Sequence, residues 1–136
     1  MASTMGAWCS WLMMSSGSVR PEESNTTRIW SSSRFQDSVD VCVVHAPTIK
    51  PFDEETVVAQ IDTDRMAFTL ENHTVIGGLF ESVAAALVKR GIGRKVRPIG
   101  LPDEFLEAGA LPTLHDRYGL STQAVVTRVL AELAAR

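Results

Sequence analysis

Residues 66–91 read MAFTLENHTVIGGLFESVAAALVKRG and contain the patterns of a strand, a turn and a helix in succession. Residues 66–71 are mostly apolar, which favours a strand, and the segment ends at a polar cluster. After the Gly77-Gly78 pair, apolar residues recur at helical spacing, namely Leu79, Val83 and Leu87. Gly91 then ends the helical pattern. A strand joined through a glycine turn to a helix predicts one unit of an α/β fold.

A second strand and helix are predicted upstream of this unit. Residues 39–46 form a nearly continuous run rich in β-branched side chains, as expected of a strand that is covered on both faces. Two prolines follow and stop the strand. Asp53 is a good N-cap for a short helix, in which Val57, Val58 and Ile61 supply the apolar face.

The pattern continues downstream with a third strand and two helices. Residues 96–101 suit a short strand, and Pro98 within it indicates a sheet edge or a strand end. Residues 111–118 are predicted to form a short helix, and Ser121 is predicted to cap a final helix that runs to residue 136. This alternation is typical of a three-layer α/β/α fold with a mostly parallel sheet.

Residues 1–38 differ in character from the rest of the chain. Ten of them are serine, and no helical or strand period persists, so we expect weak order there. Residues 7–14 form a short, largely apolar run, but no basic residue precedes it and two glutamates follow, which argues against a targeting leader. The sequence therefore divides into a serine-rich segment, 1–38, and a domain, 39–136.

Composition and charge argue against two classes of partner. No apolar run approaches the roughly 20 residues that a membrane-spanning helix needs. The net charge of −3 gives no reason to bind nucleic acid, and the basic residues between 89 and 97 are expected to lie on a solvated loop. The two cysteines, Cys9 and Cys42, show no metal-binding spacing. We therefore expect a cytoplasmic protein that binds neither membrane nor nucleic acid.

Four short landmarks resemble one known domain. They are PTIKPFD at 47–53, TLENHTVIGGL at 69–79, IGLPDEF at 99–105 and YGLS at 118–121. In this order they are similar to landmarks of the C-terminal domain of transketolases and of deoxyxylulose-phosphate synthases, which are thiamine-diphosphate enzymes. The resemblance covers residues 39–136, and its first two landmarks lean toward transketolase, including versions split over two polypeptides.

The resemblance implies a domain that does not hold the cofactor. Enzymes of this family bind thiamine diphosphate and a metal between a diphosphate-binding domain, marked by Gly-Asp-Gly, and a pyrimidine-binding domain with a catalytic glutamate. This sequence has no Gly-Asp-Gly and no room for either domain. Thiamine diphosphate and Mg²⁺ are therefore expected only in the complete enzyme. No catalytic, cofactor or metal residue is assigned here, and the expected partner is a chain with the two missing domains or another copy of this chain.

The sequence departs from the family before residue 39. The family domain opens with a strand similar to VTLIATG and a long alanine-rich helix, and residues 1–38 resemble neither. We therefore expect a domain that lacks its first strand and helix, which leaves one sheet edge and one face uncovered. A disrupted reading frame, a wrong start or a truncated gene would each explain such a junction.

The candidate anion or interface site consists of Glu71, His73, Gly77 and Gly78. A carboxylate two residues from an imidazole, at the end of a strand, lies where α/β sheets place ligands, and the amides of a helix start can hold an anion. No nucleophile or third metal ligand is evident nearby. A hydrogen-bonded turn that positions the helix is therefore the favoured interpretation. The other histidines are expected to be a satisfied sheet residue and a solvated one, His45 and His115.

Three functions follow from these patterns. The first is the structural or assembly domain of a transketolase-type ketol transferase, which would not be catalytic alone. The second is a stand-alone α/β module that binds a small anion at the start of the Gly77 helix. The third is a truncated remnant without function. The four landmarks favour the first.

Overall fold

The computed structural model describes residues 10–15, 28–31, 41–61 and 66–135. Its strands are β1 (Ser10–Ser15), β2 (Arg28–Ser31), β3 (Val41–Ala46), β4 (Met66–Thr74) and β5 (Val96–Leu101). Its helices are α1 (Glu54–Ile61), α2 (Leu79–Lys89), α3 (Leu111–Arg117) and α4 (Thr122–Ala134). Every strand and helix predicted between residues 39 and 136 is present, with bounds close to those expected.

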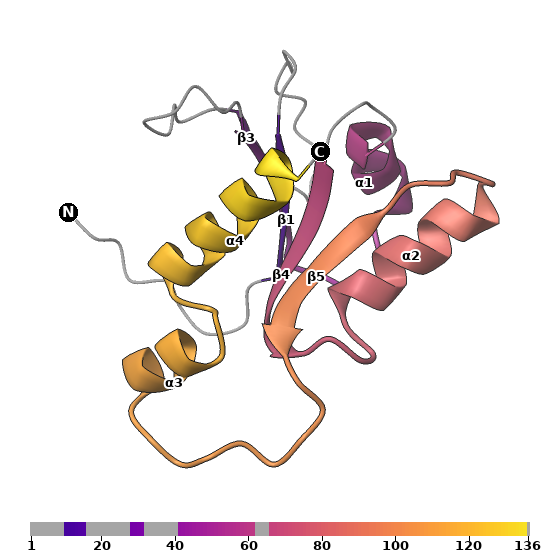
Figure 1. Ribbon diagram of the computed structural model, residues 1–136. Helices are drawn as coiled ribbons and strands as arrows, with labels where there is room; N and C mark the ends of the chain where they lie inside the picture. Colours follow the sequence, from indigo (N-terminus) through magenta and orange to yellow (C-terminus); the bar gives the residue numbers. More distant parts are fainter. Residues whose placement is uncertain (1–9, 16–27, 32–40, 62–65, 136) are drawn as a thin grey trace.

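The strands form one sheet with the order β2-β3-β1-β4-β5, and helices lie on both of its faces (Figure 1). Helices α1 and α2 cover one face and α4 the other, so the predicted three-layer α/β/α architecture is confirmed. The three predicted strands, β3, β4 and β5, run in the same direction, and β4 pairs with β5 in parallel. The two strands from the serine-rich segment pair antiparallel with their neighbours.

Strand β1 is the main departure from the sequence-based expectation of weak order in residues 1–38. It lies between β3 and β4 and pairs with both, so that Met13 is opposite Val43 on one side and Phe68 on the other. Strand β2 adds to the outer side of β3. The expectation for the rest of that segment falls outside the described residues. In the described sheet, β1 thus provides the connection between β3 and the β4–β5 pair.

Two apolar clusters hold the layers together. The one under α1 and α2 includes Val44, Val57, Ala67, Leu79 and Val83. The one under α4 comprises Met66, Phe68, Ile99, Val125 and Val129. Successive residues of β4 alternate between the two clusters because side chains alternate across a strand. Residues 66–69 of β4 are therefore buried, and both faces of this part of the strand are covered, as its mostly apolar sequence predicts.

Three of the basic residues between 89 and 97 form ion pairs with other elements, although the sequence suggested a solvated loop. Lys89 and Arg90 each donate to the Glu54 carboxylate at 2.8 Å, which joins the end of α2 to the start of α1. The hydrogen bond from Lys89, followed by that from Arg90, lowers the pKa of Glu54 below its ordinary 4.5. Arg97 pairs with Glu132 of α4 at 2.5 Å. These ion pairs use part of the basic cluster within the fold.

Two further sequence predictions are borne out. The Asp53 side chain accepts the Thr56 N–H at 3.1 Å, as an N-cap should. Pro98 lies in β5, an edge strand of the described sheet. No helix in the described part of the chain is long and apolar enough to cross a bilayer.

The central position of β1 predicts that proline is not tolerated there. Met13→Pro removes a ladder hydrogen bond whichever neighbour its N–H faces, so the free energy of unfolding should fall by at least about 1 kcal/mol in urea denaturation. Ala108→Pro, in the exposed loop after β5, is the control and should change it by less than about 0.5 kcal/mol. Equal stability of the two variants would show that β1 is not paired on both sides.

Candidate functional site

The candidate site lies where β4 ends and α2 begins, at the carboxyl end of the parallel pair β4–β5 (Figure 1). Leu70 is paired with Ile99 and Thr74 with Leu101, so β4 advances four residues while β5 advances two. The extra residues form an irregularity that changes the direction of the side chains between them. The Val75 N–H then donates to the Leu101 carbonyl at 3.3 Å, which ties the following turn to the end of β5.

Glu71 is the centre of this site. Its side chain is fully buried, with 0% exposed. Its Oε2 accepts the Leu79 N–H at 2.5 Å, and its Oε1 accepts the Phe80 N–H at 2.9 Å. These amides belong to the first turn of α2 and would otherwise lack partners within the helix. A carboxylate is also favoured at the positive end of the helix dipole, so Glu71 caps α2 from the neighbouring strand.

Gly78 makes this capping possible. It occupies the N-cap position of α2 and has no side chain of its own with which to cap the helix. A Cβ at this position would lie 2.0 Å from Glu71 Oε2 and 2.6 Å from His73 Cε1. Its φ of −104° is open to any residue, so the requirement for glycine here is one of space. Gly77 is different, because a Cβ there meets nothing within 4 Å, whereas its φ of +75° favours glycine.

His73 lies over the buried carboxylate. Its Nδ1 is 2.7 Å from the Thr74 carbonyl oxygen, which can only accept, so Nδ1 carries a hydrogen. Its Nε2 is 3.5 Å from Glu71 Oε2, and the side chain is 41% exposed. The imidazole thus lies next to a carboxylate that solvent does not reach. Within the described residues, no group of three His, Cys, Asp or Glu side chains could hold a metal ion.

Two residues that the sequence analysis did not assign to the site adjoin it. A Cβ on Gly100 of β5 would lie 2.7 Å from Val75 Cγ1 and 3.1 Å from the His73 carbonyl oxygen, so β5 can approach the irregularity only as glycine. The signal was a glycine inside a strand pattern. His115, expected to be solvated, places its Nε2 3.1 Å from Asn72 Oδ1 and joins α3 to the end of β4. His45 lies on β3, which β1 separates from β4.

The polar groups of this site bind other groups of the same chain. Both oxygens of Glu71 are occupied by backbone amides, so the carboxylate is not available as a base for a bound substrate. The same carboxylate takes the place that an anion would occupy at the start of α2, and its charge would repel a diphosphate. The site residues therefore do not fit the diphosphate of a thiamine cofactor. Their contacts are those of a joint between β4 and α2.

Comparisons with known proteins give a consistent result. Residues 35–125 match the family model for the transketolase C-terminal domain. An uncharacterized transketolase family protein of Sinorhizobium fredii is 52% identical over 96 residues, which make up 69% of this chain and 28% of the relative. A 1-deoxy-D-xylulose-5-phosphate synthase of Heliobacterium modesticaldum is 35% identical over 98 residues, which make up 72% of this chain and 15% of the relative.

A third relative, from Methanocaldococcus jannaschii, is named as a transketolase C-terminal section. It is 32% identical over 98 residues, which are 72% of this chain and 30% of the relative. The chain thus spans less than a third of the length of each of these three relatives. The matched residues include the whole of the β4–α2 joint.

The capping role of Glu71 predicts the effect of an isosteric substitution. Glu71→Gln leaves one oxygen to serve two amides, so a buried N–H loses its partner, and the free energy of unfolding should fall by about 1–3 kcal/mol in urea denaturation. Glu81→Gln, an exposed position on the same helix, is the matched control and should lie within about 0.5 kcal/mol of the wild type. A Glu71→Gln variant as stable as this control would rule out the capping role.

The close approach at Gly78 gives a second prediction. Gly78→Ala forces the new methyl group into the Glu71 carboxylate, so it should destabilise the protein by about 1–3 kcal/mol or more in thermal or urea unfolding. Gly93→Ala is the control, because a Cβ there meets nothing within 4 Å, and it should leave stability unchanged or slightly raised. If both alanines were tolerated equally, the contact between Gly78 and Glu71 would not be tight in solution.

Proposed function

The chain belongs to the family of transketolase C-terminal domains, and from this premise we propose that it is the C-terminal assembly domain of a transketolase-type ketol transferase. In this proposal it acts as a separate subunit or a fragment and is not catalytic alone. The single observation that carries the proposal is the extent of the match. One family domain accounts for the matched residues, and these correspond to less than a third of each of the three relatives compared.

The geometry of the β4–α2 joint supports a structural role. The polar groups at the carboxyl end of the sheet, where an α/β domain can bind a ligand, contact one another instead. Glu71 binds two amides, His73 covers Glu71, and Asn72 contacts α3. Each contact fixes one element of the domain against another. A domain with this use of its polar residues is suited to packing and subunit contact.

The cofactors of the reaction are proposed to be held elsewhere. Thiamine diphosphate and Mg²⁺ would be bound by a partner chain with the diphosphate-binding and pyrimidine-binding domains, and thiamine diphosphate supplies the carbanion chemistry for the transfer of a two-carbon ketol unit. The amides at the start of α2 are already used by Glu71, which argues against a diphosphate site on this chain. We further propose that the protein acts in the cytoplasm with that partner.

Calorimetry tests the proposal directly. Titration of thiamine diphosphate with Mg²⁺ into this chain should give no saturable heat, because Glu71 already occupies the amides at the start of α2. A cooperative thermal melt establishes beforehand that the chain is folded. Saturable tight binding, or ketol transfer by the chain in isolation, would refute the proposal. A flat, non-cooperative melt would instead favour a non-functional remnant.

A further inference from the structure

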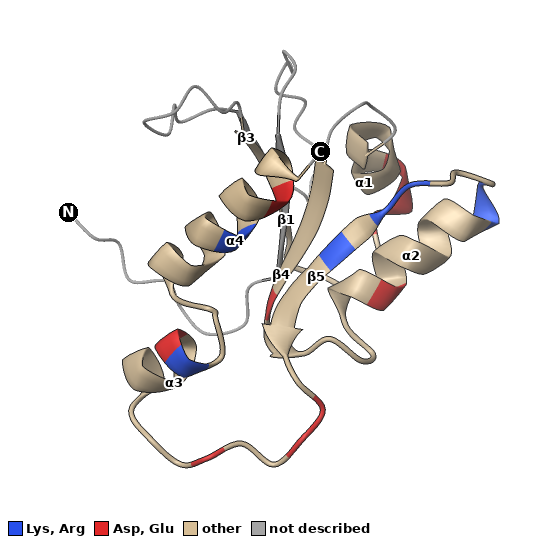
Figure 2. Ribbon diagram, in the orientation of Figure 1, with Lys and Arg blue, Asp and Glu red and all other residues tan. Residues whose placement is uncertain are grey.

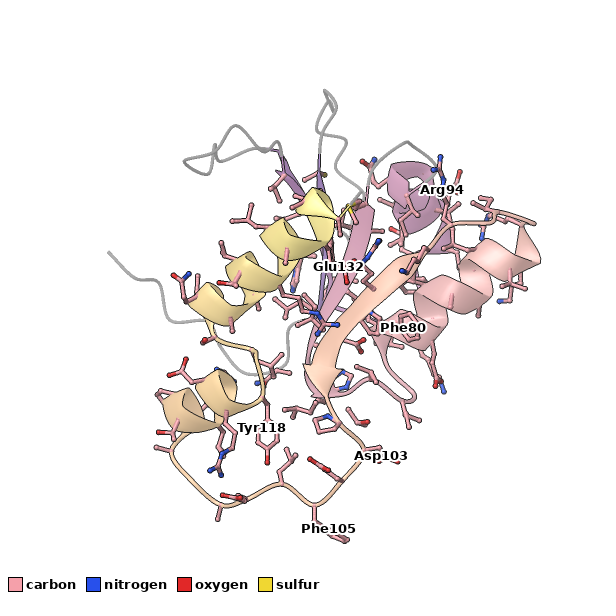
Figure 3. The ribbon with its side chains drawn as sticks, viewed as in Figure 1. Phe80, Arg94, Asp103, Phe105, Tyr118 and Glu132 are labelled. Atoms are coloured by element: carbon pink, nitrogen blue, oxygen red, sulfur yellow. The ribbon has the colours of Figure 1, made fainter. Side chains whose placement is uncertain are left out.

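The loop between β5 and α3 exposes large apolar side chains. Residues 102–110 form neither helix nor strand, and all of them are exposed. The Phe105 side chain is 107% exposed, and Leu106 and Leu111 are 36% and 59% exposed. Figure 3 shows Phe105 pointing away from the rest of the molecule. An aromatic side chain can bury roughly 150–250 Å² against a partner, so this loop offers an unused apolar anchor.

The loop is fixed at its far side by α3. The Glu107 N–H donates to the Tyr118 hydroxyl at 3.4 Å, and the Glu107 carboxylate pairs with Arg117. Helix α3 is itself joined to β4 by the bond between His115 and Asn72. The other end of the loop begins at Leu101, which accepts the Val75 N–H. Phe105 is therefore presented at a defined place at the carboxyl end of the sheet.

The same segment carries a concentrated negative charge. Residues 102–118 contain four acidic residues and one arginine, a formal charge of −3, which equals the net charge of the whole chain. The remaining residues therefore balance to zero. Figure 2 shows acidic positions along this loop and one acidic and one basic position on α3, whereas other basic positions lie on α4, on β5 and at the far end of α2. The exposed apolar anchor thus lies in an acidic surrounding.

A further exposed apolar residue lies in the adjacent turn. Ile76 is 56% exposed and directly follows Val75, whose N–H bonds to the end of β5 just before the loop begins. We call the exposed stretch of the loop around Phe105 the docking surface. It consists of Asp103, Glu104, Phe105 and Leu106.

We propose that the docking surface binds a basic protein surface with an apolar centre, located on the part of a transketolase-type enzyme that this chain does not match. This inference rests on the proposed function. The matched relatives extend well beyond the region that they share with this chain. Their remaining residues form a region large enough to cover the docking surface. Aromatic residues at the centre of an interface commonly provide most of the binding energy, and Phe105 is placed to do so.

The charge of the docking surface argues against two other occupants. A second copy that presented the same surface would bring two acidic segments together, and a copy that presented its basic end would form an open, head-to-tail chain. A membrane with anionic headgroups would repel the surface. A basic surface on a different protein is attracted to the docking surface, and such a one-to-one complex does not extend into an open chain.

Co-production with a defined probe tests this inference. The probe is the part of the Sinorhizobium fredii relative outside its 96 matched residues, produced in the same cells as the full-length chain so that the two can fold together. Sedimentation velocity should show a one-to-one complex of the two proteins. Phe105→Ser should weaken the complex at least tenfold because it removes the apolar anchor. Val88→Ser, 77% exposed on α2, is the matched control and should leave the affinity unchanged.

The acidic residues provide an independent arm. The double variant Asp103→Lys, Glu104→Lys should weaken the complex and reduce its dependence on salt, because favourable charge pairs become unfavourable. A complex that survives Phe105→Ser with unchanged affinity would overturn this inference and leave the proposed function standing. Absence of any complex with the wild-type chain would overturn both. Self-association of the chain that Phe105→Ser abolishes would show that the occupant is a second copy.

Discussion

The burial of one carboxylate constrains the whole domain. A buried carboxylate without hydrogen-bond partners destabilises a protein. The buried Glu71 side chain therefore needs its two hydrogen bonds from backbone N–H groups. Those amides exist only at the start of α2, so the end of β4 and the first turn of α2 are held at one distance. Leu79 takes part in both kinds of contact. Its N–H donates to Glu71, and its side chain packs in the apolar cluster under α1 and α2. The polar bond and the apolar packing therefore specify the same register.

The constraint extends to the neighbouring strand and the loop beyond it. Within the irregularity between Leu70 and Thr74, the His73 carbonyl lies close to β5, which accommodates it with Gly100. Strand β5 thus ends beside the turn, and the exposed loop begins there. Asn72, the next residue after Glu71, contacts α3 and so fixes the other end of the same loop. The position of the docking surface is in this sense a consequence of where the carboxylate is buried.

Features of the fold that depend on local sequence signals were predictable, whereas features that depend on contacts between distant residues were not. The bounds of α2 follow from apolar spacing between glycines, and the edge position of β5 follows from Pro98. Strand β1 was not predicted, because SWLMMS lacks an alternating pattern and owes its place to pairing with strands about 30 and 55 residues away. The Glu71 bond joins residues eight and nine apart, and its only local sign is a helix start at which glycine provides no cap. His115 and Asn72 are 43 residues apart, so composition alone suggested only a solvated histidine.

The distribution of side chains is reversed at the carboxyl end of the sheet relative to ordinary surfaces. An acid is inside and a phenylalanine is outside, although carboxylates are rarely buried unless they are paired and large aromatic side chains are seldom fully exposed. The buried acid is explained by its two amides, which complete its bonding within the chain. The exposed phenylalanine has no such explanation within the described residues, since the loop that carries it is anchored on both sides and still directs it outward. A loop that simply lacked packing would gain stability by folding Phe105 back onto apolar surface. In the proposed association a partner would cover Phe105, and the acidic residues beside it favour a partner surface of positive charge.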